Sequence, residues 1–175
     1  MVDELKATYL NKNPIIRGYS KAKVNFAIKL ADLNKQDFIL DFGCGAGWLK
    51  NKLKEQGYNV IGFDITPEHS DITDYTKINP TKIFALDVFE HIPKEDIISI
   101  LKNFKKMNPN FELITSIPTE NYLSRKARKL LGKSERVKDH ITPIKGILSI
   151  LRSELREDKK INFLTVSYIA KFKGF

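Results

Sequence analysis

Three glycines at alternate positions, Gly43, Gly45 and Gly47, follow the short apolar run Phe38–Phe42. Glycine accepts backbone dihedrals that other residues resist, and the missing side chain lets a ligand lie against the backbone. The residues that follow predict a helix over Trp48–Gln56, whose first N–H groups and positive dipole end would face an anionic group in the turn. The pattern therefore predicts a ligand-binding turn between a strand and a helix.

The glycine spacing separates two classes of nucleotide ligand. Dinucleotide-binding turns read G-x-G-x-x-G, whereas this turn reads G-x-G-x-G and has Trp48 where the third glycine would fall. Asp64 lies 21 positions after Gly43, at the end of the apolar run Asn59–Phe63. A carboxylate there can accept hydrogen bonds from both ribose hydroxyls, which NAD and adenosyl ligands alike require. The structural alternative is that Asp64 caps its own turn.

Two further carboxylates bear on the charge of the ligand. Asp41 lies in the first apolar run and Asp87 ends a later one, Lys82–Asp87. Negative side chains favour a ligand that carries an ammonium and a sulfonium, and they repel a pyrophosphate. The charge pattern thus favours an adenosyl sulfonium over a dinucleotide.

Strands and helices that alternate along the chain must position these residues. The sequence predicts an amphipathic helix over Tyr19–Leu33 and further helices after the first and third strands, before an ending rich in β-branched and aromatic residues. This alternation predicts an α/β fold, a doubly wound Rossmann-like sheet that is mostly parallel, with helices on both faces and an antiparallel strand at the C-terminus. The strands are Phe38–Phe42, Asn59–Phe63, Lys82–Asp87, Phe111–Ser116 and one or two within Ile161–Phe172; the later helices are Trp48–Gln56, Lys94–Met107 and Ile141–Leu155.

Length and composition predict one domain over residues 1–175, with a helical lead-in at 1–35 and a basic insertion at 119–140. The single cysteine and an N-terminus unlike a signal peptide predict a cytoplasmic protein, and no apolar run is long enough for a transmembrane segment. The net charge of +9 could attract anions such as nucleic acid, phospholipid or nucleotides, but it names no partner. The pattern gives no oligomeric state.

Three segments together resemble the class I S-adenosylmethionine-dependent methyltransferases, in the small-molecule branch that includes quinone-biosynthesis enzymes. They are Leu40–Gly47, Ile61–Asp64 and Ala85–Ile92, and the resemblance spans about residues 38 to 118. Dinucleotide dehydrogenases do not carry the Asp-Val-Phe-Glu-His-Ile combination of the third segment. The resemblance implies S-adenosylmethionine as the cofactor.

The same resemblance implies a role for each matching residue. Asp41 would orient the turn and meet the cofactor's ammonium group, directly or through water. Apart from the resemblance, the cofactor's carboxylate needs a donor, and Arg17, placed just before the predicted first helix, is the candidate, with a solvated arginine as the alternative. The remaining contacts would be Gly43 and Gly45 with the methionine part, Asp64 with ribose, Ile65 with adenine, and Asp87 and Val88 with the methionyl and sulfonium region.

One part of the chain departs from the family pattern. Only Thr66–Ile78 separates the second strand from the next long one, and these thirteen residues are too few for a helix, a strand and a loop. The sequence therefore predicts an abbreviated third-strand region, with a short strand at His69–Ile72. Asp71 or Asp74 could bind the adenine amino group, although Asx turns and helix caps explain such residues equally well.

Methyl transfer from a sulfonium is an in-line displacement, so the protein's main task is to align the acceptor with the methyl group in a dry pocket. If the acceptor is a hydroxyl or phenol, a histidine could take its proton. His91, with Glu90 beside it, is the candidate catalytic residue, and both could instead only fix their turn. His140 is the second candidate, with a cap or core contact as its alternative. We predict no metal ligand.

The expected acceptor is a small or lipid-like molecule, which could be anionic. Seven Lys or Arg residues in the segment 121–138 would steer such an acceptor, unless they form a solvated helix face. The alternatives are an RNA-binding or RNA-modifying protein, which the basic insertion favours, and an NAD-dependent oxidoreductase, which the glycine spacing disfavours. Because Cys44 lies inside the glycine turn, the thiolate chemistry of C5-cytosine methyltransferases is not expected.

Overall fold

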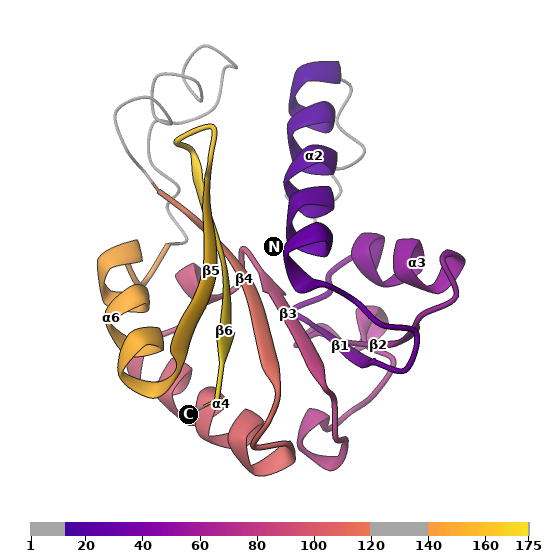
Figure 1. Cartoon of the computed structure of the whole chain (residues 1–175), viewed down its shortest axis with the longest axis vertical. Helices are drawn as coiled ribbons and strands as arrows, with labels where there is room; N and C mark the ends of the chain where they lie inside the picture. Colours follow the sequence, from indigo (N-terminus) through magenta and orange to yellow (C-terminus); the bar gives the residue numbers. More distant parts are fainter. Residues whose placement is uncertain (1–12, 120–139, 175) are drawn as a thin grey trace.

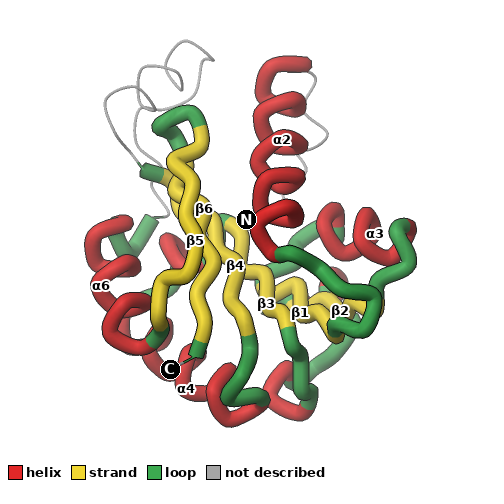
Figure 2. The backbone as a smooth tube through the Cα atoms, viewed as in Figure 1, coloured by secondary structure: helices red, strands yellow, loops and turns green. Residues whose placement is uncertain are grey.

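The computed structural model describes residues 13–119 and 140–174. Within them lies a six-stranded sheet of order β2-β1-β3-β4-β6-β5 (Figures 1 and 2). The first four strands are parallel and the C-terminal pair is antiparallel, which confirms the predicted fold class. The strands are β1 (Phe38–Phe42), β2 (Asn59–Phe63), β3 (Lys82–Leu86), β4 (Glu112–Pro118), β5 (Arg156–Phe163) and β6 (Ser167–Lys173).

Helices cover both faces of the sheet. The helices α2 (Pro14–Ala31) and α3 (Trp48–Glu55) bury Val24, Ala27 and Leu53 against one face. The helices α4 (Lys94–Met107) and α6 (Ile144–Glu154) bury Leu101 and Leu151 against the other. Successive strand residues alternate between the two cores, as the pleat of a sheet requires. The alternating pattern of the sequence thus produces two apolar layers around one sheet.

Two helices begin at other residues than the sequence pattern predicted. Helix α2 begins at Pro14, not at Tyr19, because the Asn13 side chain accepts the Ile15 N–H and proline suits the first helical position. Arg17 therefore lies within the helix rather than before it. Helix α6 begins at Ile144 rather than Ile141, since Pro143 occupies its N-cap with an extended backbone.

The C-terminal segment forms a hairpin of two strands. Strand β5 begins at Arg156, five residues before the predicted Ile161, and its first half is charged and largely exposed. An edge strand with one exposed face needs few apolar residues, so the apolar pattern missed this half. Three residues, Leu164 to Val166, join the two strands, and Leu164 and Thr165 are both left-handed at φ 48° and 59°.

The predicted strand at His69–Ile72 is wrong, although the region is abbreviated as expected. Residues 66–78 contain two short 3₁₀ helices, η1 (Pro67–His69) and η2 (Tyr75–Lys77), and β2 forms the edge of the described sheet. A single residue replaces a strand there: the Gly62 N–H donates to Asp71 Oδ2 at 2.9 Å, and the Asp71 N–H donates to the Gly62 carbonyl at 2.9 Å. Asp71 thus pairs with the edge of β2 at the single residue Gly62.

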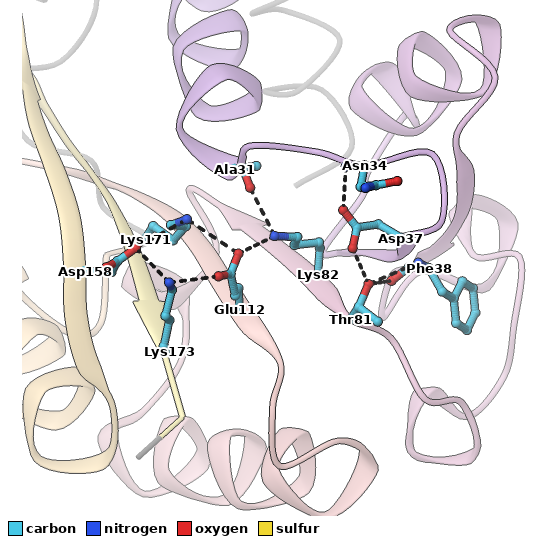
Figure 3. A network of polar contacts seen from close by, with 10 residues as sticks. All are labelled: Ala31, Asn34, Asp37, Phe38, Thr81, Lys82, Glu112, Asp158, Lys171 and Lys173. Atoms are coloured by element: carbon cyan, nitrogen blue, oxygen red, sulfur yellow. Dashed lines mark hydrogen bonds and ion pairs between the residues drawn. The ribbon is translucent and has the colours of Figure 1, made fainter.

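Ion pairs close the amino-terminal end of the parallel strands (Figure 3). Glu112, the first residue of β4, accepts from Lys82 and lies 3.5 Å from the buried Lys171 ammonium. Asp158 lies 3.3 Å from both Lys171 and Lys173. Burial raises the pKa of Glu112, but these lysines outweigh it, so the pKa lies below its ordinary value. Ion pairs therefore join β3, β4, β5 and β6 at this end of the sheet. Ligands of a doubly wound sheet bind at the opposite, carboxyl end of the parallel strands.

The basic segment predicted at 119–140 and the lead-in before Asn13 lie almost entirely outside the described residues. Among the helices of 13–119 and 140–174, none combines the length and apolar character needed to cross a membrane.

Candidate functional site

The glycine turn lies at the carboxyl end of β1, where a doubly wound sheet binds its ligand. Gly43, Gly45 and Gly47 all have left-handed backbones, with φ of 72°, 49° and 74°. The N–H groups of Gly43 and Cys44 donate to the Phe63 carbonyl at 2.8 and 3.1 Å, which fastens the turn to the end of β2. The predicted role of glycine as a conformational requirement is therefore visible at each of the three positions.

Gly43 also has no room for a side chain. A Cβ built on it would lie 2.6 Å from Cγ2 of Val88, the residue after β3 and Asp87. The turn after β1 and the turn after β3 are thus in direct contact. This contact brings the predicted residues Gly43 and Val88 together.

Asp64, which directly follows β2, fixes the glycine turn by a hydrogen bond. Its Oδ2 accepts the Gly45 N–H at 2.8 Å and its Oδ1 accepts the Thr66 N–H at 2.9 Å. The capping role and the ligand role considered from the sequence are compatible, because each carboxylate oxygen can accept a second hydrogen bond. Ile65 beside it is 80% exposed, so its apolar side chain is open to a ligand.

Asp41 is buried beneath the turn, where it is 4% exposed. One oxygen accepts the Lys50 N–H at 3.1 Å and so satisfies the first turn of α3. Burial raises the pKa of this carboxyl from 3.8 to about 7, against the opposing effect of the Lys50 hydrogen bond and charge. A small pocket lined by Asp41, Gly43 and Trp48 among others opens here. A cationic ligand group in that pocket would favour the ionised carboxylate.

Asp87 is held from several sides. Its backbone is left-handed, at φ 55°, and Oδ1 accepts from the Ser116 hydroxyl at 2.7 Å. Its other oxygen forms an ion pair with Lys23 of α2, whose side chain is 5% exposed against 31% for Asp87. A strained backbone that its surroundings fix is common at ligand sites. The geometry therefore presents a partly exposed, oriented carboxylate.

Lys23 and Ser116 were missed by the sequence analysis. Lys23 flanks the apolar face of α2 and Ser116 lies in an apolar strand, so each has an ordinary position in its own element. Their partner is 64 positions away for Lys23 and 29 for Ser116. The sequence did contain one indication of the role of Lys23. It directly precedes Val24 in the buried stripe of α2, where a charged side chain requires a partner.

Three other residues predicted for the site, Arg17, Asp71 and Asp74, form no hydrogen bond or ion pair with the glycine turn in the described part of the chain. The Arg17 side chain is exposed on α2. Asp71 completes the β2 edge and pairs with Lys50 at 2.7 Å. Asp74 caps η2 by accepting the Thr76 N–H at 3.0 Å. The cap alternative considered for Asp74 therefore describes its observed contact, whereas Asp71 contacts the β2 backbone and Lys50 rather than its own turn.

Glu90, His91 and His140 come together beyond β3. Glu90 and His91 lie in the 3₁₀ helix η3 (Phe89–His91), and His140 leads into α6. The two imidazole centroids are 5.2 Å apart with the rings nearly perpendicular, and Glu90 is buried. Oxygen and nitrogen atoms from all three residues lie within 4.8 Å of one another. The two histidines named from the sequence thus form one cluster with Glu90.

The Cys44 thiol is unsuited to nucleophilic chemistry. Burial, and next the Asp41 charge, raise its pKa to about 12, and its sulfur lies 3.3 Å from the His69 carbonyl. A thiol with such a pKa supplies almost no thiolate near neutral pH.

Comparison with known proteins gives one family and many similar folds. A family model described as "Methyltransferase domain" matches residues 16–169. No curated protein matches the sequence. The fold resembles the magnesium protoporphyrin IX methyltransferase ChlM from Synechocystis PCC 6803 with bound SAH, at TM-score 0.70 and 18% identity over 99% of this chain and 94% of that one.

Two further structures are similar over nearly the whole chain. The PH0226 protein from Pyrococcus horikoshii OT3 gives a TM-score of 0.72 at 14% identity, covering 97% of this chain and 95% of that one. The N-methyltransferase NodS from Bradyrhizobium japonicum WM9 gives 0.67 at 16% identity, covering 94% and 98%. At these identities the structural likeness concerns the fold alone.

Proposed function

The chain belongs to the methyltransferase domain family, and we propose that it transfers the methyl group of S-adenosylmethionine to a small-molecule acceptor. Methyltransferases of this fold have been crystallised with SAM and with SAH bound, which supports the same cofactor here. The observation that carries the proposal is the set of carboxylates around the glycine turn. Asp41 lies one residue before the end of β1, Asp64 and Asp87 directly follow β2 and β3, and none suits a pyrophosphate.

The described contacts support the following arrangement of the cofactor. Asp64, already oriented by the Gly45 N–H, would accept hydrogen bonds from the ribose hydroxyls, and the exposed Ile65 would lie against adenine. Asp41 and Asp87 would face the ammonium and sulfonium end, where opposite charges attract. Gly43 and Gly45 would let that end lie against the backbone, with Val88 beside it.

The cofactor's carboxylate requires a cation. Arg17 remains the proposed donor, and the structure adds Lys23, which is buried and already oriented by Asp87. The same ammonium fixes the Asp87 carboxylate in place before the cofactor binds.

The chain's own residues would carry the transfer mainly by alignment. The sulfonium methyl is already activated, so a site that holds it in line with the acceptor and excludes water supplies most of the rate. His91, with Glu90 beside it, would take a proton from a hydroxyl acceptor as the new bond forms. NodS and ChlM act on different acceptors by their names, so the fold leaves the acceptor open.

Methyl-labelled S-adenosylmethionine tests this proposal. The full chain is incubated with the labelled cofactor and either a metabolite extract or total RNA. We expect label in the small-molecule fraction, and loss of that transfer in Asp64→Asn. Incorporation into RNA alone would overturn the small-molecule assignment and favour the nucleic-acid alternative.

A further inference from the structure

Glu90, His91 and His140 have the composition of a metal site. They are the only group of three His, Cys, Asp or Glu residues within residues 13–119 and 140–174 whose ligand atoms gather this closely. Two imidazole nitrogens and one carboxylate oxygen are ligands that Zn²⁺ and similar divalent transition cations bind in proteins. The sequence pattern predicted no metal ligand, but on this geometry we propose that these three residues bind one such cation at the acceptor side of the site.

The spacing of the ligand atoms suits a single ion. All of them lie within 4.8 Å of one another. Two ligands bound to one zinc ion at about 2.1 Å lie at most about 4.2 Å apart. Small side-chain rotations therefore bring the three residues to binding distance without movement of the backbone.

The backbone holds the two halves of this site together. The N–H groups of Ile141 and Thr142 both donate to the Glu90 carbonyl, at 2.7 and 3.2 Å. The Thr142 hydroxyl donates to the Ile92 carbonyl at 2.7 Å. Residues about fifty positions apart are thus fastened on either side of the cluster. A site whose ligands are fixed in this way loses little conformational entropy when an ion binds.

Burial supports a cation at this point. Glu90 is 2% exposed, and His91 and His140 are half-buried. An ionised carboxylate removed from water is stabilised by a nearby positive charge, which a bound divalent cation supplies. Glu90 lies three residues after Asp87 along the chain.

Three protein ligands leave at least one coordination position open, as in catalytic rather than structural zinc sites. His91 ends η3, whose N-cap is Val88 in the turn with Asp87, so the open position would lie on the side of the proposed methyl donor. The acceptor class that fits is a molecule with an oxygen ligand for the cation, such as a phenol or catechol. With the cation bound, His91 is a ligand and no longer the base; the cation would lower the pKa of the bound hydroxyl, whose proton would pass to water. This last step rests on the proposed function, whereas metal binding itself does not.

Metal titration of the intact chain tests the site without cofactor or acceptor. After treatment with EDTA, the protein is titrated with Zn²⁺ by calorimetry and with Co²⁺ by visible absorption. We expect one ion per chain and a loss of affinity of at least about tenfold in His91→Asn and in His140→Asn. The third histidine of the chain, His69, provides the matched control, and His69→Asn should bind as the parent does.

Two results would overturn the site: a parent protein without stoichiometric Zn²⁺ or Co²⁺ binding, or a His69→Asn variant as weak as His140→Asn. Melting curves in EDTA show whether each variant is folded, and Glu90→Gln tests the carboxylate without loss of volume. If Zn²⁺ binds and labelled methyl transfer fails, the metal site stands and the proposed function fails. If labelled methyl is transferred and Zn²⁺ does not bind, only the metal site is refuted.

Discussion

The buried carboxyl of Asp41 predicts a pH-dependent cost to stability that the variant Asp41→Asn should remove. Its pKa is raised from 3.8 to about 7, chiefly by burial. That difference corresponds to at most about 4 kcal/mol of preference for the protonated form in the folded protein. Asparagine has nearly the same shape, and its Oδ1 can still accept the Lys50 N–H, so the substitution isolates the charge.

The direction of the change in unfolding free energy with pH follows from proton binding. Between about pH 4 and pH 7 the unfolded chain releases this proton while the folded chain keeps it, so the free energy of unfolding falls as the pH rises. Asparagine does not titrate. We therefore expect equal stabilities of the parent and Asp41→Asn near pH 4, and a more stable variant at pH 8, by up to about 4 kcal/mol.

Urea denaturation from pH 4 to pH 8 measures this difference. The m-values of both proteins should agree, so that the midpoints report stability alone. Parallel pH profiles, or a parent more stable than Asp41→Asn at pH 8, would refute the assignment of a raised pKa to Asp41. A gain in stability at the expense of cofactor affinity is the trade-off expected at a ligand site.

Three further variants test the turn, the sheet edge and the carboxylate donor. Gly43→Ala must adopt φ 72° and would place its Cβ 2.6 Å from the Val88 side chain. We expect it to lower the free energy of unfolding by more than about 2 kcal/mol and to weaken S-adenosylhomocysteine binding. The control Gly18→Ala, in a helix with open space around it, should raise the free energy of unfolding by up to about 1 kcal/mol. Asp71→Ala removes the carboxylate that accepts the Gly62 N–H and pairs with Lys50, and should cost about 1 to 3 kcal/mol in urea denaturation. The cap variant Asp74→Ala should cost less than about 1 kcal/mol, and equal costs would contradict the edge role of Asp71. Arg17→Ala should weaken S-adenosylhomocysteine binding more than about tenfold by calorimetry, and an unchanged Kd would remove Arg17 from the site.

Elements with a strong apolar period could be predicted from the sequence. The bounds of β1, β2 and α4 agree with the predicted Phe38–Phe42, Asn59–Phe63 and Lys94–Met107. Strand β5 could not be placed in the same way, because its first residues, Arg156 to Lys160, face solvent at a sheet edge and carry no apolar signal. Edge pairing by Asp71 was equally hidden, since it depends on one side chain that meets a backbone nine positions away.

The site residues were also predictable only in part. The positions of Asp41, Asp64 and Asp87 at strand ends follow from local pattern and parallel pairing. The partners that orient them do not: Lys23 reaches Asp87 from a helix that enters the fold 64 positions earlier. The cluster of His91 with His140 likewise depends on hydrogen bonds that join segments about fifty positions apart. Such contacts arise only when the whole sheet is assembled.

The central claim is that the glycine turn and its carboxylates bind S-adenosylmethionine rather than a dinucleotide. Calorimetric titration of the parent and Asp64→Asn with S-adenosylmethionine and with NADH tests it most directly. We predict that the parent binds S-adenosylmethionine at one site, that Asp64→Asn binds it more weakly, and that neither binds NADH. Binding of NADH without S-adenosylmethionine would contradict the account.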